Sequence, residues 1–238
     1  MNLRENIPRK VRGLLKTIGR LADERNVQAY AVGGCVRDWC LGIQRVTDVD
    51  VTVEGDGIAM ARAVARHFNG TIQIHEQFGT ATVCGAGPRG IRVDVASCRR
   101  EVYERPAAYP RVLAGTLQDD LFRRDFTINA MAVRLEPGHV GVLVDPFHGV
   151  QDLRRRLLRI LHARSFSDDP SRILRGVRFA VRFGLRWERG TAAALRRAVA
   201  AGALGRLNAG RLHKELARMV DEPDPQACWA HFASLLVA

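Results

Sequence analysis

Residues 32–53 have the sequence VGGCVRDWCLGIQRVTDVDVTV, which carries the strongest structural pattern in the chain. A β-strand is expected to enter the glycine pair Gly33-Gly34, and a helix is expected to leave it. Glycines let the backbone approach a ligand closely and point free N–H groups at it, and the start of a helix adds a partial positive charge. Arg37, within the first turns of that helix, could complete a site for an anion such as a phosphate. A glycine pair by itself is more often only a turn, so the residues that follow are decisive.

Two aspartates follow the turn at a spacing that suits metal binding. Asp48 and Asp50 are separated by one residue, so on a strand both point to the same side, while the valines that alternate with them point into the core. Aspartate is disfavoured in strands, and the pair therefore indicates a function. It could hold Mg²⁺, which takes one or two carboxylates together with substrate phosphates, as in phosphoryl transfer by two metal ions. The structural alternative is an edge strand protected by its charges.

A third carboxylate lies on a later strand. Asp94 belongs to the alternating segment 91–97, so it could join the side of the sheet that carries the first two aspartates. It could equally face solvent and pair with Arg92 on its own strand. The sequence leaves both interpretations open.

The pattern of secondary structure changes near residue 146. Before it, strands are expected at 27–32, 48–54, 71–75, 80–84, 91–97 and 140–144, with helices at 8–25 and 57–68. After it, only helices are expected, at 150–156, 169–184, 191–200, 208–219 and 225–237. The expected fold class is α+β. A first domain, residues 1–150, has a mixed sheet with flanking helices, and a second domain, residues 151–238, is all-α.

Basic charge is concentrated in the second domain. The 238 residues carry 37 Lys+Arg and 25 Asp+Glu, a net charge of +12. Residues 151–238 contribute +9 of this, from 17 basic and 8 acidic side chains. A basic surface of this kind predicts a polyanionic partner, with nucleic acid as the first choice and solubility alone as the alternative.

Cysteine count and hydropathy indicate a cytoplasmic protein. The five cysteines are an odd number and include no Cys-x-x-Cys pair, so neither a disulfide framework nor a zinc site is expected. No apolar run approaches the ~20 residues that a membrane span needs, and the N-terminus has no apolar signal stretch. We therefore expect a soluble protein with reduced thiols and no membrane partner. Nothing in the sequence predicts its oligomeric state.

Three longer motifs narrow the function. Residues 119–132 read DDLFRRDFTINAMA, residues 145–153 read DPFHGVQDL, and residues 166–180 read FSDDPSRILRGVRFA. The glycine turn and the Asp-x-Asp strand resemble the nucleotidyltransferase superfamily typified by DNA polymerase β. With these motifs in order, the chain resembles the class II tRNA nucleotidyltransferase and bacterial poly(A) polymerase family. A late helix with Arg211 and Glu215 resembles the last and weakest family motif.

The resemblance implies a polymerase-β-like nucleotidyltransferase domain and assigns site residues within it. The aspartates matching Asp48 and Asp50 would hold Mg²⁺ and carry the catalysis, and Gly33, Gly34 and Arg37 would contact the incoming nucleotide. The residues matching Arg124, Asp125 and Asn129 would bind the triphosphate and select a ribose 2′-hydroxyl. The structural alternative for Arg124 and Asp125 is a salt bridge at a helix start.

The resemblance also implies that the second domain reads the base. The residues matching Asp169 and Arg172 would pair with the Watson–Crick edge of an incoming C or A, and a spacing of three residues would place both on one side of a helix. Arg175 and Arg178 would continue that side toward the phosphates. A surface ladder of Asp and Arg is the alternative. Asp168 stands where many family members have Glu.

Residues 99–116 contain Pro106, Pro110 and Gly115 and show little periodicity, so we expect a mobile loop. Family members that add the terminal A retain a flexible loop in this region, whereas those that add only the two Cs have a shorter one. The loop therefore favours an activity that includes A addition.

Taken together, the resemblance implies template-independent transfer of CMP and AMP from CTP and ATP to the 3′ end of tRNA, with Mg²⁺ as cofactor. The basic second domain would hold the tRNA, mostly through its phosphates. An A-only enzyme, a CC-only enzyme and a poly(A) polymerase are alternatives with the same motifs. A truncated RNA-binding remnant is the non-enzymatic alternative, and a small-molecule nucleotidyltransferase would explain the carboxylates but not the base-reading motif.

Overall fold

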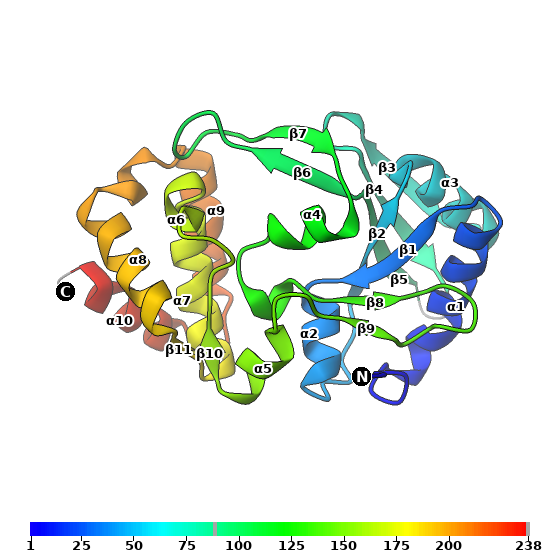
Figure 1. The fold of residues 1–238 in the computed structure, drawn as a ribbon, viewed down its shortest axis with the longest axis horizontal. Helices are drawn as coiled ribbons and strands as arrows, with labels where there is room; N and C mark the ends of the chain where they lie inside the picture. The colour runs from blue at the N-terminus through cyan, green and yellow to red at the C-terminus, as the bar shows by residue number, and fades with distance from the viewer. Residues whose placement is uncertain (88–89, 237–238) are drawn as a thin grey trace. The chain divides into compact units, whose positions relative to one another are not determined.

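The computed structural model describes residues 1–87 and 90–236, which group into two compact units (Figure 1). The first unit comprises Met1–Arg100, Val112–Arg124 and Asn129–Phe147. The second comprises Glu101–Arg111, Asp125–Ile128 and the chain from His148 onward. Two short segments that precede residue 150 thus group with the second unit. Periodicity could not reveal this grouping, because it depends on contacts between residues far apart in the chain.

A seven-stranded mixed sheet forms the first unit, with the spatial order β3-β4-β5-β2-β1-β8-β9. Strands β2 and β5 run parallel, and the other neighbours are antiparallel. The predicted α+β class with a mixed sheet is confirmed. The strands are β1 (Gln28–Val32), β2 (Asp48–Glu54), β3 (Thr71–His75), β4 (Thr80–Ala86), β5 (Ile91–Ser97), β8 (Ala132–Arg134) and β9 (Leu143–Val144).

Two long helices pack against this sheet, α1 (Arg9–Asp23) and α3 (Gly57–Phe68) (Figure 1). The apolar residues of α1 recur at helical spacing and are buried, as the sequence predicts. Helix α3 begins where the carboxylate of Asp56 accepts a hydrogen bond from the N–H of Ala59. The shorter elements of this part of the chain are α2 (Gly34–Cys40), η1 (Glu76–Phe78), α4 (Leu117–Phe122) and η2 (Thr127–Asn129).

Strand β2 shows the alternation that positions the site. Val49, Val51 and Val53 are each at most 1% exposed, so their side chains belong to the core. Asp48 and Asp50, which alternate with the first two valines, point to the other side of the sheet. Parallel pairing with β5 then places Asp48 beside Arg92 on the same side.

Helices dominate the second unit, and their apolar sides form its core. Leu174 and Val177 of α7 pack with Met219 of α9 and Cys228 of α10. None of the helices in the described chain has the length and apolar character needed to span a membrane. The helices are α5 (Gly149–Arg154), α6 (Ser165–Asp168), α7 (Ser171–Phe183), α8 (Arg189–Ala200), η3 (Ala203–Arg206), α9 (Ala209–Val220) and α10 (Pro225–Leu236).

The prediction that the second domain is all-α is wrong in one detail. Strands β10 (Leu157–Leu158) and β11 (Arg186–Trp187) form a parallel pair. Two-residue strands are too short to produce a periodic pattern, which is why the sequence gave no sign of them. Trp187 extends from this pair into an aromatic cluster, with ring centroids 6.2 Å from Phe126 and 6.3 Å from Phe166.

The expectation of a loop without regular structure over 99–116 is also wrong in part. Strands β6 (Arg99–Val102) and β7 (Arg111–Ala114) pair as a two-stranded ribbon. Pro106, Pro110 and Gly115 interrupt the segment, and each strand has only four residues, so no alternation marks them in the sequence.

Two glycines on α1 test how the helix packs. A Cβ atom on Gly19 would lie 1.7 Å from the carbonyl oxygen of Leu135, whereas a Cβ atom on Gly13 would meet nothing within 4 Å. Gly19→Ala is therefore expected to lower the free energy of unfolding by about 1–3 kcal/mol, because backbone must move. Gly13→Ala is expected to raise it by up to about 1 kcal/mol through helix propensity. Urea denaturation measures both, and equal effects would contradict this packing.

Candidate active site

A pocket of about 320 Å³ opens in the first unit beside β2, β4 and β5. It brings Asp50 of β2, Asp94 of β5 and Arg124 of the later motif together. Thr80 and Thr82, which the sequence analysis did not single out, also line it. The remaining lining residues are Val32, Val51, Thr52, Ala81, Val95, Ala96 and Arg123.

Three aspartates share the polar side of β2 and β5. The register places Asp50 beside Asp94 and Asp48 beside Arg92. The hydroxyl of Thr82 donates to Asp94 Oδ1 at 2.6 Å, and the other oxygen of Asp94 lies 2.9 Å from Nη2 of Arg92. Asp94 therefore satisfies both interpretations that the sequence left open. It lies beside the carboxylate pair, and it also forms an ion pair with Arg92.

The aspartate pair fits a divalent metal ion that other ligands complete. Burial raises the pKa of Asp50 to about 6, while Arg124 acts in the opposite direction, so the charge of this carboxylate is incompletely compensated. A divalent cation beside Asp48 and Asp50 would compensate it. Within residues 1–87 and 90–236, no three His, Cys, Asp or Glu side chains are grouped to enclose a metal. A pair of carboxylates is a ligand set that Mg²⁺ accepts, since it completes its shell with water and phosphates.

The glycine turn requires glycine at its first position. Gly33 has φ +75°, a conformation that other residues rarely adopt. A Cβ atom there would lie 2.6 Å from Nη1 of Arg124. Gly34 begins α2. The structure thus brings the guanidinium of Arg124 against the glycine turn, and so joins two motifs that are far apart in the sequence.

Arg37 lies beneath the turn in a buried polar network. Its Nη1 donates to the side-chain oxygen of Asn129 at 2.7 Å, and its Nε and Nη2 donate to Asp38 at 2.9 and 2.8 Å. Arg37 and Asn129 are each 6% exposed. Two of the predicted site residues are therefore brought together, because Arg37 of α2 donates a hydrogen bond to the side chain of Asn129.

Asp120 is a functional candidate that the sequence analysis missed. It is fully buried and binds Nη2 of Arg123 at 2.7 Å and Nη2 of Arg124 at 2.9 Å. Burial raises the pKa of Asp120, but Arg124 and Arg123 more than offset this and hold it below its ordinary value. Its spacing of three and four residues from two arginines on one helical turn was the available signal. Both arginines that Asp120 binds, Arg123 and Arg124, line the pocket.

In the second unit, Asp125 pairs with Arg175. The Nε atom of Arg175 donates to Asp125 Oδ2 at 2.8 Å, and the N–H of Phe126 donates to Asp125 Oδ1 at 2.8 Å. The guanidinium of Arg175 also lies 5.5 Å from the ring centroid of Phe179. Arg124 and Asp125 are adjacent in the chain, but each has its own partner: Arg124 binds Asp120 and Asp125 binds Arg175. These pairs differ from the simple salt bridge between Arg124 and Asp125 that the sequence offered as an alternative.

Asp169 and Arg172 are each held by side-chain contacts. Asp169 Oδ1 accepts hydrogen bonds from Nη2 of Arg211, from the hydroxyl of Ser171 and from the N–H of Ser171, the last at 3.0 Å. Arg172 is 4% exposed, and its Nη1 donates to Ser165 Oγ at 2.7 Å. All three of these bonds to Asp169 in the described chain go to one oxygen, and Oδ2 is left to accept from a ligand.

The prediction that a single helix carries both residues is wrong. Helix α7 begins at Ser171, and Asp169 has an extended backbone, with φ −135° and ψ 91°. The cause is Pro170, because the residue before a proline is disfavoured in a helical conformation. Asp169 therefore lies in the link between α6 and α7, and Arg172 lies in the first turn of α7.

Arg178 was expected to continue the binding side of α7, but its guanidinium lies in a buried ion network. Its Nε donates to Glu222 at 2.7 Å and its Nη1 to Glu215 at 3.1 Å. Arg182 binds the same Glu222. This network connects α7 to α9 and to the turn after it.

Asp168, which stands where many family members have Glu, is 7% exposed. One of its carboxylate oxygens lies 3.1 Å from Nη2 of Arg164.

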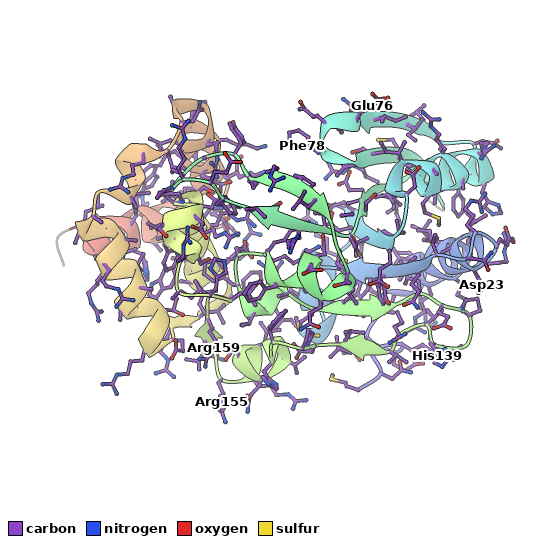
Figure 2. The ribbon with its side chains drawn as sticks, turned by 45° about the horizontal axis from the view of Figure 1, so that its top comes forward. Asp23, Glu76, Phe78, His139, Arg155 and Arg159 are labelled. Carbon is purple, nitrogen blue, oxygen red and sulfur yellow. The ribbon has the colours of Figure 1, made fainter. Side chains whose placement is uncertain are left out.

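A second group that the sequence analysis missed anchors segment 125–128. The hydroxyl of Thr127 donates to Asp152 at 2.7 Å, and Nε of Arg159 lies 3.0 Å from the same carboxylate oxygen. Figure 2 labels Arg159 and also Arg155, the exposed residue that directly follows α5. The motif at 145–153 thus acts through Asp152, which fixes the backbone that follows Asp125.

Comparisons with known proteins agree with this geometry. Residues 29–159 match the family described as the poly A polymerase head domain. The chain is 42% identical over 226 residues to an A-adding tRNA nucleotidyltransferase of Halalkalibacterium halodurans and 42% identical over 223 residues to one of Geobacter sulfurreducens. An apo form of a CCA-adding enzyme superposes with a TM-score of 0.90 at 40% identity, covering 97% of this chain and 54% of that one. Solved CCA-adding enzymes of this fold include complexes with ATP, with CTP and with tRNA, at TM-scores of 0.86, 0.87 and 0.84.

These relatives are longer than this chain. The match covers 94% of the chain in both A-adding relatives, but only 52% of the Halalkalibacterium protein and 25% of the Geobacter protein. The chain therefore spans about half or less of the length of these two relatives.

Asp120 gives a test of the charge network at the pocket. Asp120→Asn is expected to lower the free energy of unfolding by about 3–5 kcal/mol at neutral pH, because two arginines lose a buried partner. Since the pKa of Asp120 is lowered in the folded protein, its contribution is present above the ordinary aspartate value of about 3.9 and is lost as the pH falls below it. Urea denaturation from neutral pH into this acidic range should show a shallower decline for Asp120→Asn than for the wild type. A wild-type slope in the variant would contradict the network, and the exposed Asp23→Asn serves as control.

Proposed function

The chain belongs to the family of the poly A polymerase head domain, and on this basis we propose that it transfers AMP from ATP to the 3′ end of a tRNA that already ends in CC. The observation that carries the proposal is the meeting of Asp50, Asp94 and Arg124 at one pocket, with Asp48 beside them. Carboxylates for a metal and an arginine for a triphosphate are the groups that nucleotidyl transfer requires. Maturation of tRNA would place the protein in the cytoplasm.

In the first unit, Asp48 and Asp50 would hold the divalent metal, with Mg²⁺ as the proposed ion. A metal held there supplies charge neutralisation for the triphosphate and activation of the primer hydroxyl. Arg124, held in place by Asp120, would bind the triphosphate, and the missing side chain at Gly33 leaves room for its guanidinium. The protein's contribution is positioning and charge, without a covalent intermediate.

In the second unit, Asp169 and Arg172 would select the base. Adenine and cytosine each present an amino donor beside a ring acceptor, whereas uracil and guanine present a carbonyl acceptor beside a ring N–H donor. Asp169 Oδ2 can accept from the amino group, and a guanidinium such as that of Arg172 can donate to the ring nitrogen. Arg211 and Ser171 fix Asp169 through its other oxygen. We assign Arg178 to the support of this unit, since Glu215 and Glu222 occupy its guanidinium.

Two observations favour A addition within the family. The two relatives of 42% identity described above are named A-adding enzymes. The ribbon β6–β7 and the residues between its strands are present, as expected of members that add A. Complete CCA addition, which uses CTP as well, is the second candidate, because solved relatives of this fold bind CTP and ATP.

The tRNA would be held largely by the second unit. Residues 151–238 carry +9 of the net charge, and Arg154, Arg155 and Arg156 form an exposed basic run at the end of α5. Figure 2 shows Arg155 extending away from the ribbon. Contacts of this kind bind phosphates without regard to sequence.

Incubation of the purified chain with tRNA transcripts tests the proposal. Transcripts that end before CCA, at C and at CC are supplied with labelled ATP or CTP, singly and together, and the products are sized on a gel. The expected result is one AMP added to the transcript that ends in CC. Incorporation of CMP would indicate CC or CCA addition, long A tracts would indicate a poly(A) polymerase, and no incorporation into any transcript would refute the activity.

Asp48→Asn and Asp50→Asn test the metal pair. Each is expected to reduce AMP transfer to less than about 1% of the wild-type rate, because the triphosphate loses its neutralising metal. Retention of tRNA in a gel-shift assay should be unchanged, since the basic second unit is intact. Asp23→Asn, an exposed aspartate at the end of α1, is the matched control (Figure 2). Greater residual transfer in either variant would exclude that residue as an essential ligand.

A further inference from the structure

Arg92 occupies a position that the proposed function does not use. It lies on β5, directly beside Asp48 of β2 in the parallel register and two residues before Asp94. Its Nη2 lies 3.2 Å from Asp48 Oδ2 and 2.9 Å from Asp94 Oδ2. One nitrogen of Arg92 thus bridges two carboxylates that lie on two adjacent strands.

The two carboxylates are held in the same manner. Asp48 Oδ1 accepts from the hydroxyl of Thr47 at 2.6 Å, and Asp94 Oδ1 accepts from the hydroxyl of Thr82 at 2.6 Å. The second oxygen of each carboxylate faces Arg92. The threonines orient the carboxylates, and the guanidinium supplies the positive charge between them. Without it, three aspartates would face one another on neighbouring strands.

Arg92 can also leave this position. Its side chain is 51% exposed, and those of Asp48 and Asp94 are 42% and 30% exposed. Ion pairs that reach solvent to this degree contribute little to stability, and the long arginine side chain has many accessible rotamers. By contrast, Asp120 and Asp125 are no more than 6% exposed, so the arginines that bind them are paired with buried carboxylates.

We propose that Arg92 is a built-in counter-cation of the carboxylate group, which a divalent metal ion must displace in order to bind Asp48. This inference rests on the proposed function in one respect, that Asp48 and Asp50 hold the metal. The guanidinium neutralises the carboxylates while the metal is absent and weakens the binding of a bare metal ion by like-charge repulsion. A metal that arrives with a triphosphate brings its own negative charge and meets less repulsion. Arg92 therefore favours the metal–nucleotide complex over the free ion.

Mn²⁺ binding, followed by electron paramagnetic resonance of the free ion in the absence of nucleotide, tests the inference. Arg92→Gln removes the charge and is expected to tighten Mn²⁺ binding about fivefold or more, the size expected for loss of one exposed charge interaction. Arg92→Lys keeps the charge and should retain the wild-type affinity. Arg62→Gln, an exposed arginine on α3, is the matched control and should change nothing. Arg92→Met is a second neutral variant, in case the glutamine amide itself binds the carboxylates.

Each outcome has one meaning. Tighter binding in both neutral variants, with Arg92→Lys like the wild type, supports the counter-cation. Equal or weaker binding in the neutral variants overturns it, and weaker binding would show that Arg92 helps to assemble the metal site. Asp48→Asn separates this result from a failure of the premise. If Asp48→Asn binds Mn²⁺ as the wild type does, the metal is not held at Asp48, and both the proposed metal site and this inference fail.

A nucleotide titration gives a second readout. In the presence of a non-hydrolysable ATP analogue, the difference in Mn²⁺ affinity between the wild type and Arg92→Gln should shrink, because the triphosphate offsets the repulsion. An undiminished difference would contradict the preference for the metal–nucleotide complex.

Discussion

The alternation of side chains along β2 is the constraint on which the rest of the site depends. Val49, Val51 and Val53 are almost completely buried, and their burial fixes the register of the strand, because a shift by one residue would place aspartates in the core. The carboxylates of Asp48 and Asp50 are thereby forced to the polar side of the sheet. Parallel pairing with β5 then brings Asp94 beside Asp50. The position of the proposed metal site is thus a consequence of hydrophobic packing on the opposite side of the sheet.

A second principle is that arginines in both units are held by carboxylates of the protein. Asp120 binds Arg123 and Arg124, Asp125 binds Arg175, and Glu215 and Glu222 bind Arg178. Such pairs keep long basic side chains ordered before a polyanion arrives, so less conformational entropy is lost when it binds. Residues 1–150 carry only +3 of the net charge, although they include the proposed triphosphate site. The excess positive charge remains on the second unit, where a large polyanion would be bound.

The sequence predicted the elements that have a clear period, and it failed where structure depends on short or distant contacts. Strand β2, helix α3 and the glycine turn were predicted with nearly the observed bounds. The pairs β6–β7 and β10–β11 were missed, because strands of two to four residues have no detectable alternation. Asp169 was expected within a helix over 169–184, but Pro170 disfavours a helical conformation at the residue before it, and α7 begins only at Ser171. Asp120 and Asp152 were missed as well, since a buried carboxylate is recognised by its partners.

By itself, the sequence determined the chemistry that is available. It contains the aspartate pair, the glycine turn and the arginine-rich motifs in their order, because these are local patterns that follow from the geometry of a single strand or helix. Only the tertiary structure decided which of these groups face one another. Arg124 lies against Gly33, Arg37 supports Asn129, and Arg92 bridges Asp48 and Asp94. The reason is physical: the partners of a charged side chain are set by strand order and burial, which depend on contacts between residues that are distant in the chain.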